Sequence, residues 1–152
     1  MSDTEYSPEA LCDLLTAGAT AIGRPNVQAA VHLLTFTSLP HRRDFPSLIV
    51  FEYVDTDGVS APAAFVRDWK ALPASRAADR IGSGDARMLA LAVGLATGEP
   101  VDLRENVAVG GHAHARRVIE AIAIATGYGE MFTVTPTPKL DELLAARDAL
   151  TR

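Results

Sequence analysis

The sequence of 152 residues predicts a mostly helical α+β protein. Two observations carry this prediction. Residues 88–96 and 118–125 are long apolar segments bounded by helix-ending glycines, and residues 46–54 are rich in β-branched and aromatic side chains. We expect the two apolar helices to form a shared core. An N-terminal helical hairpin and one or two strands would pack with this C-terminal helical unit.

The N-terminal hairpin is marked by the ends of its helices. Ser7 suits an N-cap, Pro8 the first helical position and Gly23 a left-handed C-cap. A second helix is expected to begin at Pro25 and to pack antiparallel on the first. Its polar residues fall opposite its apolar face, so we expect them in solvent. They are Gln28, His32 and Thr35.

Residues 46–54 predict a strand with two mostly apolar faces, so we expect it to be covered on both sides. Residues 59–72 fit two structures, a helix or a strand that returns beside residues 46–54. We favour the helix, with Trp69 in the core, because Pro62 argues against an internal strand.

The domain organisation follows from composition. Residues 1–72 form the N-terminal unit, residues 73–82 are a linker of mixed small, polar and charged residues, and residues 83–152 form the C-terminal unit. One compact domain overall is the alternative.

The C-terminal unit has a predicted order of elements that is typical of the first part of a winged helix. A helix over 84–97 is followed by a short helix within 102–108, a helix over 112–126 and a strand over 131–135. A last helix begins at Pro138. Its apolar side consists of Leu140, Leu143, Leu144 and Leu150.

Composition and charge restrict the function. The net charge of −5 disfavours a nucleic-acid partner held by general electrostatics. Cys12 is the one cysteine and has no cationic neighbour in sequence, so we expect an inert thiol. The acidic start, MSDTEYSPEALCDLL, lacks the pattern of a signal peptide, and no run of about 20 apolar residues is present. We therefore expect a cytoplasmic protein without a membrane partner.

The start of the helix over 112–126 is the candidate site, because four residues there are or can be cationic: His112, His114, Arg116 and Arg117. One interpretation is a solvated stripe in which the arginines pair with Glu120. The other is contact with phosphate or nucleic acid, because a helix N-terminus offers free N–H groups. Both interpretations stay open here, and the first is favoured.

Metal, cofactor and catalytic sites are not predicted. His112 and His114 would point roughly 200° apart on a helix and have no third ligand nearby. The sequence contains no phosphate-binding G-x-x-x-x-G-K-[S/T] loop and no G-x-S-x-G elbow. We expect no cofactor and no enzymatic activity.

Residues 82–127, GSGDARMLALAVGLATGEPVDLRENVAVGGHAHARRVIEAIAIATG, resemble uncharacterised proteins of high-GC actinobacteria and their phages. The resemblance covers less than a third of the chain. It implies no activity and assigns no site residue.

The function predicted from sequence is non-catalytic interaction or assembly. The two apolar helices exceed the needs of one small core, which favours a homo-oligomer or a protein partner. They also imply that Ile122→Asp would unfold the protein. The alternative is a degenerate winged-helix protein that contacts DNA phosphates with the start of the 112–126 helix.

Overall fold

A computed structural model describes residues 5–152 of the chain; residues 1–4, the start of the acidic N-terminal stretch, lie outside the described residues. The fold is mostly helical α+β, as the sequence predicts. The α-helices and strands are α1 (Pro8–Ile22), α2 (Pro25–Leu34), β1 (Ile49–Thr56), β2 (Val59–Val66), α3 (Ser83–Thr97), α4 (Leu103–Asn106), α5 (His112–Ala125) and α6 (Pro138–Leu150). The short 3-10 turns are η1 (Leu39–His41), η2 (Phe45–Leu48), η3 (Trp69–Ala74), η4 (Arg76–Ala78) and η5 (Gly129–Met131).

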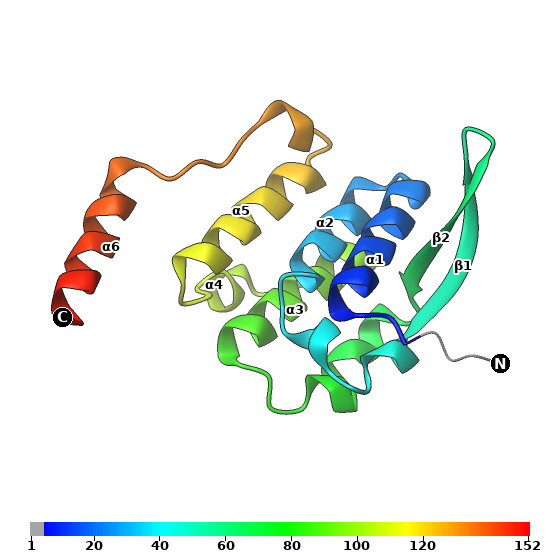
Figure 1. The fold of residues 1–152 in the computed structure, drawn as a ribbon, viewed down its shortest axis with the longest axis horizontal. Helices are drawn as coiled ribbons and strands as arrows, with labels where there is room; N and C mark the ends of the chain where they lie inside the picture. Colours follow the sequence, from blue (N-terminus) through cyan, green and yellow to red (C-terminus); the bar gives the residue numbers. More distant parts are fainter. Residues whose placement is uncertain (1–4) are drawn as a thin grey trace.

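The predicted helical hairpin is α1 and α2. Ser7 Oγ accepts a hydrogen bond from the Ala10 N–H at 3.1 Å, and Gly23 ends α1 in the left-handed conformation with φ of 69°. Helix α2 is the centre of the molecule, because it packs against α1, α3 and α5 (Figure 1). The three residues expected in solvent, Gln28, His32 and Thr35, are instead all partly buried, and Arg117 of α5 bonds to His32 and Thr35.

The core consists of two adjoining clusters of buried side chains. One cluster joins α1, α2, the strands and α3 around Phe45 and Leu34, and the other joins α2, α3 and α5 around Met88 and Ala121. The expected linker, 73–82, is mostly exposed, but Ala77 belongs to the first cluster and attaches the segment to the core. Trp69 is half-buried and packs against both clusters.

The preference for a helix over residues 59–72 is wrong. Residues 59–66 form β2, which pairs antiparallel with β1. Pro62 stands opposite Tyr53 in this ribbon. The Arg67 N–H bonds to the Leu48 carbonyl oxygen, so by antiparallel alternation Pro62 and Tyr53 are a non-hydrogen-bonded pair, and the missing N–H costs no bond between the strands.

The expectation that the strand is covered on both sides is also wrong. Ile49 is buried at the base of the hairpin, but Phe51 and Tyr53 are 42% and 77% exposed. The hairpin packs on α1 through Ala63 and Ala64 near its base and projects from the body towards its tip (Figure 1). Gly18 permits this contact, since a Cβ there would lie 2.1 Å from the Ala64 carbonyl oxygen.

The C-terminal third departs most from the prediction. Helix α5 buries Val118 and Ala121 but leaves Ile119 and Ile122 exposed, so only one of its faces belongs to the core. The expected strand over 131–135 is wrong: η5 is followed by extended chain that pairs with no strand in the described residues. The strand that would follow the recognition helix of a winged helix is therefore lacking in residues 5–152.

Helix α6 lies apart from the helical body, at the end of the extended segment 132–137 (Figure 1). None of its side chains is buried, and Leu143 and Leu150 are 62% and 87% exposed. Among the described residues, no helix combines the length and hydropathy needed to cross a bilayer.

Candidate functional site

The four cationic residues predicted at the start of α5 do not form one surface. His112 and Arg116 are exposed, and Arg116 Nε lies 3.9 Å from Glu120 Oε2, as an ion-pair stripe predicts. His114 and Arg117 are partly buried and contact other helices. The predicted phosphate site is therefore divided between an exposed half and an internal half.

Arg117 holds α5 against the end of α2. Its Nε donates a hydrogen bond to the His32 carbonyl oxygen at 2.6 Å, and its Nη2 donates to Thr35 Oγ1 at 3.2 Å. The guanidinium carbon lies 5.4 Å from the centre of the Phe36 ring. The carbonyls of the last turn of a helix have no partner within the helix, so Arg117 satisfies a group that would otherwise need water. The expectation that Arg117 lies in a solvated stripe is wrong.

His114 joins α5 to the start of α3. Its Nε2 lies 3.1 Å from Asp85 Oδ1, and Asp85 Oδ2 accepts the Ser38 N–H at 2.9 Å. The His114 and Phe36 rings also pack nearly perpendicular to each other, with their centres 5.2 Å apart. Burial alone would raise the pKa of Asp85, but hydrogen bonds from Ser38 and His114 hold this pKa below its ordinary value. His114 is thus a structural residue rather than a free anion ligand.

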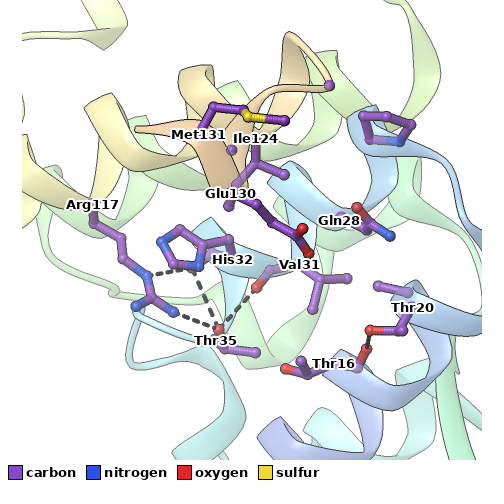
Figure 2. Close-up of a pocket in the computed structure, with 14 residues that line it drawn as sticks. Thr16, Thr20, Gln28, Val31, His32, Thr35, Arg117, Ile124, Glu130 and Met131 are labelled. Carbon is purple, nitrogen blue, oxygen red and sulfur yellow. Dashed lines mark hydrogen bonds between the residues drawn. The ribbon is translucent and has the colours of Figure 1, made fainter. Parts of the chain in front are cut away.

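A cavity of about 480 Å³ opens between α1, α2, α5 and the segment 127–131. This volume is in the range of small-molecule binding sites. Figure 2 shows Arg117 on one side of the cavity and Gln28 on the other, with Glu130 extending from the segment above them. Helix α1 adds Thr16 and Thr20 at the rim.

Sequence reasoning missed this cavity, although its signal was present. Gln28, His32 and Thr35 repeat at helical spacing on α2, and Thr16 and Thr20 repeat on α1. A polar stripe on a helix is ordinarily a solvated face. Here the stripes of two paired helices face a common space, which only the placement of α5 and segment 127–131 reveals.

His32 forms the wall between this cavity and a second hollow of about 410 Å³ under residues 132–135. Its Nε2 lies 3.5 Å from Glu120 Oε1, which is longer than a normal hydrogen bond, and is buried without a hydrogen-bond partner in residues 5–152. Burial lowers the pKa of His32 and Arg117 lowers it further, and Glu120 does not outweigh them. The imidazole is therefore neutral at pH 7.

Cys12 lies near the cavity but is not an activated thiol. Its Sγ is 3.7 Å from the Thr35 carbonyl oxygen, and the side chain is half-buried. Burial raises the pKa of Cys12, and Asp13 and Glu9 raise it further. The thiol is protonated near neutral pH.

An apolar face is exposed on the opposite side of α5. It consists of Leu103, Ile119 and Ile122, which are 57%, 55% and 46% exposed, and we call it the α4–α5 face. Leu103 and Ile122 flank a groove of about 270 Å³ whose floor is formed mostly by aliphatic side chains. These are Leu33, Leu91, Leu95, Val101 and Val118.

Similarity to known proteins adds no assignment: no protein-family model, curated protein or solved structure matches this chain. Within residues 5–152, no three His, Cys, Asp or Glu side chains lie close enough to share a metal ion. The cavity, the α4–α5 face and α6 are therefore the features that bear on function.

Proposed function

We propose that the protein is a non-catalytic assembly protein that self-associates by exchanging α6 between two copies. The observation that supports this proposal is that α6 has no buried residue. An isolated helix of 13 residues is marginal in water, because a short helix gains most of its stability from tertiary packing. Helix α6 therefore needs a surface to cover its leucines.

The leucines of α6 form a face of their own. Leu140, Leu143, Leu144 and Leu150 fall within an arc of roughly 120° by the helical period. Arg147 lies within this arc, and its aliphatic stem can extend across an apolar partner while the guanidinium reaches solvent. Because Arg147 falls near the middle of this arc, the partner surface has to accommodate one guanidinium among the leucines.

The α4–α5 face of a second copy is the partner that we propose. It is the apolar surface around the 270 Å³ groove, and about half of the surface of Leu103, Ile119 and Ile122 stays exposed in the single chain. If each copy places α6 on the α4–α5 face of the other, the two contacts are identical and the assembly closes as a symmetric dimer. Exchange would cover both apolar surfaces at once.

DNA binding by the start of α5 is the less supported function. His114 and Arg117 are held by Asp85 and by the end of α2, so only His112 and Arg116 remain exposed at the helix start. The net charge of −5 opposes attraction to a duplex.

Cross-linking between differently labelled chains tests the exchange. In a Cys12→Ser background, one chain carries Leu143→Cys and the other, with a distinct mass label, carries Ile122→Cys. We expect a disulfide between the two chains after mild oxidation. Tyr53→Cys, on the exposed hairpin, is the matched control and should form no such link with Leu143→Cys.

Two results would contradict the proposal. One is the absence of a mixed disulfide, together with efficient linkage when both cysteines are placed on a single chain; α6 would then cover its own body. The other is equal linkage to Tyr53→Cys, which would indicate random collision.

A further inference from the structure

We propose that the 480 Å³ cavity is a binding site for a small zwitterion of amino-acid type with an apolar side chain. Arg117 would bind the carboxylate, Glu130 the ammonium group, and the apolar part of the cavity wall the side chain. The site lies within one chain, so it does not depend on the exchange of α6.

Among the described residues, Arg117 has no ion-pair partner at contact distance, although Glu120 on the same helix acts on it electrostatically. Within residues 5–152, no carboxylate lies within 4.0 Å of this guanidinium, which is partly buried. Only its Nε and one Nη2 N–H have protein acceptors, and both acceptors are neutral oxygens. An arginine carries five N–H donors in a planar fork that matches a carboxylate. The three remaining N–H donors have no acceptor among the described residues.

Glu130 brings the opposite charge to the cavity. This carboxylate also lines the cavity, and it has no ion pair or hydrogen bond among the described residues. Figure 2 shows its side chain extending from η5 towards the middle of the cavity. A simple anion would meet Arg117 but would be repelled by Glu130. A ligand with both charges satisfies both groups.

The remaining wall of the cavity is mostly apolar. Ala19, Val31, Ile124 and Met131 present apolar atoms, and the neutral imidazole of His32 adds no further positive charge. One cation and one anion leave no excess charge for a phosphate dianion, so a monocarboxylate fits better. Gln28 and Thr35 offer neutral hydrogen-bonding groups beside the two charges.

A matched set of probes tests the charge pattern. L-Norleucine carries both charges, hexanoate lacks the ammonium group, and pentylamine lacks the carboxylate. Binding to the full-length protein is followed by amide NMR shifts. Because each charge-assisted hydrogen bond is worth more than a tenfold factor in affinity, we expect norleucine to bind at least about tenfold more tightly than either single-charge probe. The shifts should map to residues 16–35 and 117–131.

Substitutions test whether Arg117 and Glu130 bind the two charges of the ligand. Arg117→Gln should weaken norleucine binding at least about tenfold, whereas Arg116→Gln, the adjacent exposed arginine, should leave it unchanged. Glu130→Gln should lower norleucine affinity to that of hexanoate. Because Arg117 also holds α2, a variant at the rim is needed as well: Thr20→Trp, at an exposed position, should block all binding by filling the cavity.

Three results would overturn the proposal. The first is no saturable shift with norleucine up to about 20 mM, the concentration at which even a weak site would respond. The second is equal affinity for hexanoate and norleucine that Glu130→Gln leaves unchanged. The third is binding that survives Thr20→Trp, because the ligand would then occupy another surface.

Discussion

Two adjacent arginines have opposite environments. Arg116 is exposed and faces Glu120 at 3.9 Å, whereas Arg117 is partly buried and donates two hydrogen bonds to α2. Successive helical residues point about 100° apart, so one residue of displacement separates solvent from the interior. The pair therefore provides a matched test of what the buried guanidinium contributes.

Arg117→Gln should lower the free energy of unfolding by about 1–3 kcal/mol, because the His32 carbonyl oxygen loses a charged donor. Arg116→Gln should change the free energy of unfolding by less than about 1 kcal/mol, as exposed ion pairs contribute little. Urea unfolding of both variants measures the difference. Equal effects of the two substitutions would show that Arg117 does not hold α5 to α2.

His32 should make stability depend on pH. Its pKa is lowered in the folded protein, chiefly by burial, so below the ordinary pKa of about 6.5 the unfolded chain binds a proton that the folded chain does not. Stability should therefore fall as pH decreases through this value. The free energy of unfolding is measured at several values between pH 7.5 and pH 5.5. It should depend less steeply on pH in His32→Gln than in the unmodified protein.

His112→Gln is the control for this experiment, because His112 is an exposed histidine on α5. It should keep the slope of the unmodified protein. If stability depended on pH equally in the unmodified protein, His112→Gln and His32→Gln, a group other than His32 would cause the dependence.

At the scale of the element, neighbouring residues of α5 differ sharply in burial. Ala121 is fully buried between α2 and α3, whereas the adjacent Ile122 is 46% exposed on the α4–α5 face. The sequence suggested a helix buried over its whole apolar length, so an acid at position 122 was expected to unfold the protein. The exposure of Ile122 removes the reason for that expectation.

Ala121→Asp should unfold the protein or cost roughly 3 kcal/mol or more, because the new charge has no partner in the core. Ile122→Asp should change the free energy of unfolding by less than about 1 kcal/mol and instead weaken the dimer. Thermal melts followed by circular dichroism at low protein concentration compare them. If Ile122→Asp unfolds the chain, the α4–α5 face is part of the core and cannot receive α6.

Local signals in the sequence predicted the helices well. Ser7, Gly23 and Gly98 mark helix ends by capping and by positive φ, and these requirements are local. The strand over 59–66 was considered, but the helix was favoured because of Pro62. Proline excludes only internal strands, and whether a strand is internal depends on the whole sheet.

The candidate site was predicted only in part. The sequence drew attention to Arg117, but its partner atoms lie more than 80 positions away in the chain. Glu130 was not singled out, because an exposed acid in a turn carries no signal of its own. A cavity formed by three helices and a turn depends on packing, and periodicity within one helix cannot reveal it.

At the scale of the molecule, the chain consists of a packed body and a C-terminal arm, residues 132–150. The body carries the partly exposed α4–α5 face, and the arm carries the exposed Leu143 and Leu150 of α6. Apolar surfaces that remain exposed on a folded chain mark sites of interaction. The central claim is that these two surfaces cover each other between two copies.

Sedimentation equilibrium across a wide range of protein concentration tests this claim most directly. The full chain should approach twice its mass of 16.1 kDa, and a Leu143→Asp, Leu150→Asp variant should remain at the monomer mass with unchanged helical content in the body. The two leucines are exposed in the single chain, so this variant should not unfold it. A monomer mass for the unmodified chain at every concentration, or a dimer that survives both substitutions, would contradict the exchange of α6.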